Sequence, residues 1–141
     1  MHKFALLRPA DVRTRWGEIA PLLAAAVAHG LGELEVDDIL GLVEKNRMCV
    51  LVLEQDGVVE LALAAEVARY PKKSVLRICY AGGKNGAVVA RRYYPTLEQI
   101  GRVFGASAVE CWCRPSVARY LKRLFPDVHQ AYVVMQREVQ A

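Results

Sequence analysis

Three strand-like segments separated by two short turns dominate the middle of this chain. Residues 48–53 form an apolar run, and the Gln-Asp-Gly sequence at 55–57 is a strong signal for a hairpin turn. Over residues 58–70 the odd positions are apolar and the even positions are smaller or more polar, which is the alternation of a half-buried strand. A second turn at 71–74 leads into the apolar residues 75–81. The sequence therefore predicts a three-stranded antiparallel meander.

The remaining segments are helical except for two further strands. Apolar residues recur at helical spacing over 11–29, 36–46, 87–104 and 116–124, and strand patterns cover 107–113 and 131–138. Pro21 either kinks the first helix or opens a second segment, Pro95 interrupts the third helix, and Pro115 opens the last. A strand, a helix of about 18 residues and another strand form a crossover, which joins parallel strands. The predicted order α-α-β-β-β-α-β-α-β is a mixed α+β fold, with a mostly antiparallel sheet and one parallel crossover.

Composition indicates one globular domain over residues 1–141. Hydrophobic residues make up 54% of the 141 and charged residues 24%, so the chain can bury a core. No apolar run approaches the ~20 residues that span a membrane, and the first apolar stretch is too short for a signal peptide. We therefore expect a cytoplasmic protein. The net charge of +4 permits an acidic ligand, but the basic residues are too scattered to favour nucleic acid.

The four cysteines predict no metal site and no redox motif. Cys111 and Cys113 flank one tryptophan in a predicted strand, which is not the CxxC spacing of redox pairs. Zinc would need paired short spacings with histidine or further cysteines, and the three histidines offer none. We expect buried, reduced and inert thiols at these two positions and at Cys49 and Cys79.

A glycine-rich bend follows the third strand of the meander. Residues 82–87 contain three glycines and lead into a predicted helix, where free backbone N–H groups favour an anion such as phosphate. The alternative is that these glycines only turn the chain. There is no Walker loop and no Gly-x-Ser-x-Gly sequence, which argues against an NTPase and a hydrolase.

This order of elements, together with the segments 76–83 and 117–124, resembles the GNAT (Gcn5-related N-acetyltransferase) fold. More narrowly, the chain resembles small GNAT-like proteins encoded by bacteriophages and prophages. The resemblance covers nearly the whole chain and implies a cofactor, acetyl-CoA or a related acyl-CoA. It assigns Ile78, Cys79 and Tyr80 to the pantetheine arm of that cofactor. The pyrophosphate loop would consist of Gly82, Gly83, Lys84, Asn85, Gly86 and Ala87. Arg91 and Arg92 would make further phosphate contacts nearby.

The chain departs from the family pattern in two places. Gly83 and Gly86 are separated by two residues where the family has one, and Arg77 lies five residues before Gly82 rather than three. Leu121 occupies the position of the family's general-acid tyrosine. Tyr120 is one residue early, which rotates it by about 100° on a helix, so we expect it in the core.

Two carboxylates are candidates for the general base that an amine acceptor needs. Glu66 and Glu60 share the more polar face of the long strand and could act through a water. As ordinary solvated strand carboxylates they would need no function. A cofactor could enter only where the strands over 75–81 and 107–113 diverge.

Two functions follow from these observations. The first is an acyl-CoA-dependent N-acyltransferase that acetylates an amine which the sequence does not identify. The second is a catalytically inactive GNAT-like protein that serves as a phage accessory or protein-interaction module. The final strand could pair with a neighbouring molecule, so a dimer is possible.

Overall fold

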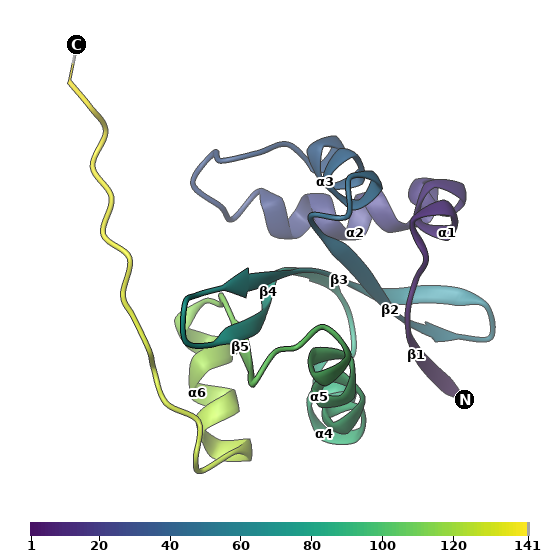
Figure 1. The fold of residues 1–141 in the computed structure, drawn as a ribbon. Helices are drawn as coiled ribbons and strands as arrows, with labels where there is room; N and C mark the ends of the chain where they lie inside the picture. The colour runs from purple at the N-terminus through teal and green to yellow at the C-terminus, as the bar shows by residue number, and fades with distance from the viewer. Residues whose placement is uncertain (141) are drawn as a thin grey trace.

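A five-stranded sheet forms the centre of the molecule in a computed structural model, which describes residues 1–140 (Figure 1). The strands lie in sequence order: β1 (His2–Leu6), β2 (Cys49–Gln55), β3 (Val58–Arg69), β4 (Ser74–Gly83) and β5 (Ala108–Cys111). The first four pair antiparallel, and β5 pairs parallel to β4. The predicted mixed α+β class, with its meander and parallel crossover, is confirmed.

Helices cover both faces of the sheet. In Figure 1, α1 (Pro9–Thr14), α2 (Trp16–Val27) and α3 (Val36–Glu44) lie on one side of the sheet. On the other side lie α4 (Gly86–Arg92) and α5 (Tyr94–Val103), which form the crossover, and α6 (Pro115–Leu124) beside β5. In the part of the chain that the structure describes, no helix has the length and apolar character needed to cross a membrane.

Each face of the sheet has its own core, and strand alternation explains which residues enter which. On β2, Leu51 and Leu53 belong to the cluster under α4 and α5, while Val50 and Val52 belong to the cluster under α1, α2 and α3. In the middle of β3, Leu61 and Leu63 belong to the first of these clusters, and Ala62 and Ala64 belong to the second. The alanines face α2, so this helix can approach the sheet closely.

Two helix breaks and one strand differ from the prediction. β1 pairs along its whole length with β2, a long-range contact that a five-residue segment does not signal. The first helix breaks at Arg15 rather than at Pro21, which lies inside α2 on the exposed surface. The break between α4 and α5 falls at Tyr93. Pro95 then stands in the first turn of α5, where its missing N–H costs nothing.

The end of the chain is the largest departure from the prediction. The strand expected over 131–138 does not form, and β5 is four residues long where seven were expected. An alternating pattern specifies a strand only when an edge is available to pair with it. Within residues 1–140 the final segment is extended and has no strand partner.

Candidate functional site

The sheet opens where β4 continues past the end of β5. The parallel ladder ends at Ile78 and Cys111, and the backbone N–H of Trp112 donates to the Ile78 carbonyl at 2.9 Å. Beyond this point, residues 79–83 of β4 pair only with β3 in the described part of the chain. We call residues 79–83 the free edge of β4. The expected divergence of the two strands is therefore present.

A β-bulge at Cys79 starts the free edge. Ala65 lies opposite Ile78 and Ala64 lies opposite Tyr80, so Cys79 is an extra residue on β4. A bulge bends its strand and increases the local twist. This bend accounts for the loss of pairing between β4 and β5 directly after Ile78.

The bulge also determines which backbone groups face the opening. The N–H of Lys84 donates to the Glu60 carbonyl at 2.8 Å. The backbone N–H and C=O groups of every second residue before Lys84 therefore also point toward β3. Tyr80 is one of these, and Ala81 therefore points its N–H and C=O away from β3. The sequence assigned the cofactor strand to Ile78, Cys79 and Tyr80. The sequence did not indicate Ala81, because a one-residue bulge cannot be recognised from the alternation of apolar and polar residues.

Two of the three predicted loop glycines belong to the strand instead. Gly82 and Gly83 pair with Ala62 and Leu61. A Cβ at Gly82 would lie 1.8 Å from the carbonyl oxygen of Leu22 on α2, and one at Gly83 would lie 2.1 Å from the Glu60 carbonyl, with φ at +120°. These glycines are required by the packing of α2 and β3 on β4. The turn itself is limited to Lys84, Asn85 and Gly86.

Glu60 holds this turn from beneath. Asn85, in the left-handed conformation at φ 68°, donates from Nδ2 to Glu60 Oε1 at 3.0 Å. His2 Nε2 lies 2.9 Å from the same oxygen, and Lys84 Nζ lies 3.5 Å from Oε2. The Asn85 hydrogen bond, followed by His2 and Lys84, lowers the pKa of Glu60. A carboxylate with a lowered pKa is a weaker base than an ordinary glutamate, and the contacts of Glu60 hold the turn in place.

A shallow hollow of about 310 Å³ opens beside this turn. It is lined by Leu22, Val58, Val59, Glu60, Gly83 and Lys84. The hollow adjoins the end of the free edge of β4.

Glu66 lies elsewhere on β3, and the structure does not bring the two candidate bases together. Six residues of strand separate them, which is roughly 20 Å. Glu66 accepts a hydrogen bond from Arg77 Nη1 at 3.1 Å. It also lies beside the Cys79 thiol, close to the start of the free edge. Of the two carboxylates, Glu66 is therefore the one next to the opening.

Arg77 organises the end of β5 and was missed as a site residue. Its Nε donates to Glu110 at 2.6 Å, its Nη2 donates to the Tyr70 hydroxyl at 2.8 Å, and its guanidinium lies 4.5 Å from the Trp112 ring centre. Burial alone would lower the pKa of Arg77, but Glu110, Glu66 and Tyr70 together raise it. The sequence signal was available, because Glu66, Arg77 and Glu110 occupy matching positions on neighbouring strands.

Tyr80 connects the same part of β4 to the segment between α2 and α3. Its hydroxyl donates to Glu33 Oε1 at 2.5 Å. Burial, together with Glu33, raises the pKa of Tyr80. Burial also raises the pKa of the Cys79 thiol to about 12, which makes this cysteine a poor nucleophile.

The two arginines of α4 lie at its last turn, away from the turn at 84–86. Arg91 Nε donates to the hydroxyl of Tyr120 on α6 at 3.0 Å, and the guanidinium of Arg92 lies over the Tyr93 ring. Tyr120 is half-buried and linked to Arg91, rather than being part of the core as predicted. Ala87 is exposed in the first turn of α4.

The cysteines are free, as expected, but they are not all buried and inert. Cys113 lies just beyond β5 and is exposed. A hydrogen bond between the thiols of Cys111 and Cys113 lowers the pKa of Cys113. The same hydrogen bond, together with burial, raises the pKa of Cys111. Burial raises the pKa of Cys49 to about 11. Within residues 1–140, no three His, Cys, Asp or Glu side chains are grouped as metal ligands.

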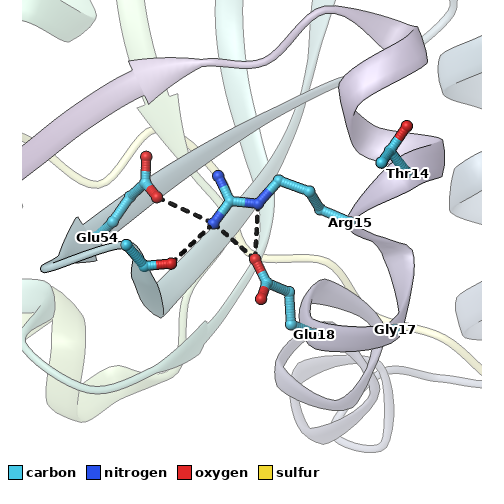
Figure 2. Close-up of a pocket in the computed structure, with 6 residues that line it drawn as sticks. Thr14, Arg15, Gly17, Glu18 and Glu54 are labelled. Carbon is cyan, nitrogen blue, oxygen red and sulfur yellow. Dashed lines mark hydrogen bonds and ion pairs between the residues drawn. The ribbon is translucent and has the colours of Figure 1, made fainter.

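A larger hollow of about 510 Å³ lies between the α1–α2 junction and the β2–β3 turn (Figure 2). Arg15 occupies it. Its Nη2 donates to Glu54 at 2.9 Å and to the Gly57 carbonyl at 3.3 Å, and its Nε donates to Glu18 at 2.6 Å. These bonds hold the helix break against the hairpin. None of the predicted site residues lines this hollow.

Comparison with solved structures identifies the architecture. An aminoglycoside acetyltransferase from an uncultured soil metagenomic sample, in complex with sisomicin, superposes with a TM-score of 0.74 at 12% identity over 99% of this chain and 97% of that one. The chain has the GNAT fold. An aminoglycoside N-acetyltransferase in complex with CoA gives 0.70 at 12% identity, over 98% and 95% of the two chains. A ribosomal-protein-alanine N-acetyltransferase from Brucella melitensis biovar Abortus 2308 gives 0.66 at 16%, over 99% of each.

Sequence comparison adds nothing to this result. No protein-family model matches the chain. No curated protein matches it either. At 10–16% identity, the structural likeness establishes the fold and leaves the reaction to be argued from the residues.

Proposed function

We propose that this chain is an N-acyltransferase that binds acetyl-CoA or a related acyl-CoA along the free edge of β4. The observation that carries the proposal is the divergence of β4 from β5 at the Cys79 bulge, which leaves the backbone of Ala81 available to an extended ligand. An amide-bearing chain such as pantetheine can pair with such an edge as a strand would. The CoA-bound neighbour supports this cofactor class.

The cofactor's pyrophosphate would lie at the turn over residues 84–86, at the end of the free edge. Glu60 holds this turn through Asn85 and Lys84. Gly82 and Gly83, which the sequence places in the pyrophosphate loop, lie directly before this turn, where neither position has room for a side chain. Arg91 and Arg92 remain candidates for outer phosphate contacts, at the far end of α4.

In the proposed reaction, the amine nitrogen attacks the thioester carbonyl, and the CoA thiolate leaves as the new amide forms. Glu66, through a water, would accept the proton that the attacking nitrogen loses. The proton would then be available to the departing thiolate. The acceptor is an amine of unidentified class. We also propose a cytoplasmic location, which would be the cytoplasm of the host cell if a phage encodes the chain.

One observation favours a non-catalytic alternative. The Tyr120 hydroxyl accepts a hydrogen bond from Arg91, and Leu121 stands at the position that the family resemblance gives to the general acid. A GNAT-fold accessory or interaction protein would retain the sheet without turnover.

Calorimetry with CoA tests the binding step. We expect micromolar binding, weakened about tenfold or more by Gly86→Glu, since a carboxylate placed beside phosphates costs at least ~1.4 kcal/mol. A Cβ at Gly86 meets nothing within 4 Å, so the new side chain does not disturb packing. Gly41→Glu is the matched control, because a Cβ at this α3 glycine also meets nothing. Absence of binding at millimolar CoA would refute the proposal.

Thiol release from acetyl-CoA in the presence of primary amines tests the chemistry. We expect Glu66→Gln to lower kcat by about 10²-fold or more while CoA affinity is kept. CoA binding without thiol release for any amine would favour the non-catalytic alternative.

A further inference from the structure

Two cysteines lie close together where β5 ends. Cys111 is the last residue of β5, and Cys113 follows it after Trp112. The thiols of the two cysteines are hydrogen-bonded to each other, as the same-side placement of alternate residues in a strand allows. The proposed acyl transfer gives neither thiol a role. The folded chain therefore holds two free thiols in contact, outside the machinery described so far.

The two thiols have different surroundings. Cys111 is half-buried against the core under α4 and α5, whereas Cys113 is exposed. The hydrogen bond with Cys111 lowers the pKa of Cys113 to about 7, so about half of this residue is thiolate at neutral pH. The same hydrogen bond, together with burial, raises the pKa of Cys111. An accessible thiolate beside a second, protonated thiol is the arrangement of cysteines that react with oxidants and are then closed by a resolving partner.

The other two cysteines do not have this arrangement. Burial raises the pKa of Cys79 to about 12 and that of Cys49 to about 11. Both are therefore protonated at neutral pH, and a protonated thiol is a poor nucleophile. Cys79 lies near enough to Cys111 to influence its pKa, so it is the competing partner that an experiment has to exclude.

We propose that Cys111 and Cys113 are a modification site for hydroperoxides, at which the two thiols close to a disulfide. The Cys113 thiolate attacks one oxygen of hydrogen peroxide, the O–O bond breaks, and hydroxide leaves as a sulfenic acid forms on Cys113. The Cys111 sulfur then attacks the Cys113 sulfur. The S–O bond breaks, and the departing hydroxide takes the Cys111 proton and leaves as water. In sum, one peroxide is reduced and two thiols are oxidised, which gives one disulfide and two waters.

The backbone around Trp112 has the freedom that this disulfide needs. Residues two positions apart in a strand have Cα atoms about 6.6 Å apart, at the upper end of the roughly 4.4–6.8 Å that disulfides span. β5 ends at Cys111 and α6 begins at Pro115, so the small shortening that closure requires falls outside regular elements. The N–H of Trp112 donates to the Ile78 carbonyl. Oxidation therefore acts where the opening between β4 and β5 begins.

Thiol counting and peptide mass test this proposal, which does not depend on cofactor binding. The intact chain is reduced and then treated with one equivalent of hydrogen peroxide, and we expect its four free thiols to fall to two. The tryptic peptide over residues 103–119 contains both cysteines of the pair and neither of the others, because trypsin does not cut between Arg114 and Pro115. This peptide should become lighter by two hydrogens, and dithiothreitol should restore its mass.

Single substitutions separate the roles of the two cysteines. Cys113→Ser should slow the loss of thiols by about tenfold or more, because it removes the thiolate. Cys111→Ser keeps a hydrogen-bond donor but no second thiol, so dimedone should trap a sulfenic acid on Cys113. Cys49→Ser is the matched control and should form the disulfide at the rate of the unsubstituted chain. Cys113 is exposed, so its substitution should leave the melting temperature unchanged.

Three results would overturn the proposal. The first is an unchanged mass for the peptide over residues 103–119 after peroxide treatment of the unsubstituted chain. The second is a disulfide that joins Cys113 to Cys79 or to a second molecule. The third is a Cys113→Ser variant that loses thiols as fast as the unsubstituted chain.

Discussion

The chain divides into two regions that use their apolar residues differently. Every buried hydrophobic side chain of residues 1–140 lies at or before Ala106. After it, residues 107–140 contain β5, then α6, in which no residue is fully buried, and the exposed final segment. The first region holds all the buried apolar residues, whereas the second contributes only partly buried ones, such as Val109 and Cys111, to the core. The difference indicates that the first region supplies most of the stability of the fold.

The largest expected effect comes from comparing leucine-to-alanine substitutions in the two regions. Leu51 is fully buried in the first region, and Leu124 is half-buried on α6. We expect Leu51→Ala to lower the free energy of unfolding by about 2–5 kcal/mol, because it leaves a cavity. Leu124→Ala should lower it by about 1 kcal/mol or less. Denaturant titration measures both, and equal losses would contradict the division into regions.

The next largest effect should be the difference in stability between alanine substitutions at two nearby glycines of the first region. Gly82→Ala places a Cβ against the Leu22 carbonyl, and we expect a loss of about 1–3 kcal/mol in unfolding free energy as α2 shifts. Gly86→Ala meets open space and should be neutral or slightly stabilising. Thermal melts of the two variants decide this. If both were neutral, α2 would not lie as close to β4 as the structure has it.

A smaller effect should appear only in acid. Because Asn85, His2 and Lys84 lower the folded-state pKa of Glu60, the carboxylate stabilises the fold above its unfolded pKa of about 4.5, and this stabilisation is lost as the pH falls through the folded value. We expect Glu60→Gln to be less stable than the unsubstituted chain at pH 7. The gap should close below pH 4. A gap that is constant with pH would show that the charge of Glu60 is not what holds the turn.

The last comparison concerns the reactivity of two thiols and does not involve stability. Cys113, in the second region, has a lowered pKa through Cys111, whereas burial raises the pKa of Cys49 to about 11. Iodoacetamide near neutral pH should therefore alkylate Cys113 first and well before Cys49, because the thiolate is the reactive form. Mass spectrometry of a time course gives the order. Equal rates would show that the environment of Cys113 does not differ from that of Cys49.

Much of the fold could be predicted because local pattern and tertiary structure agree there. The hairpin at residues 55–57, the alternation on β3 and the proline that opens α6 each depend on near neighbours in sequence. β1 could not be predicted, since its five residues become a strand only against β2. The expected strand at 131–138 failed for the same reason, because its pattern has no edge to join within one described chain.

The structure shows packing roles for candidate site residues that the sequence did not indicate. Gly82 and Gly83, predicted in a phosphate loop, also lie where α2 and β3 leave no room for a Cβ. Glu60, predicted as a candidate general base, also accepts a hydrogen bond from Asn85 and lies 2.9 Å from His2 Nε2. Glycines and carboxylates look alike in sequence whether they bind a ligand or a neighbouring backbone. Only the distances to Leu22 and Asn85 distinguish the two.

The sequence by itself determined the periodicities: which residues face a core, where the turns fall, and that a crossover joins two parallel strands. Tertiary structure alone decided the Cys79 bulge, the end of the β4–β5 ladder, the partners of Glu60 and Arg77, and the isolation of the final segment. The physical reason is range. Propensity and alternation act over a few residues, whereas a bulge, an ion-pair network or an open sheet edge exists only once segments far apart in the chain have met.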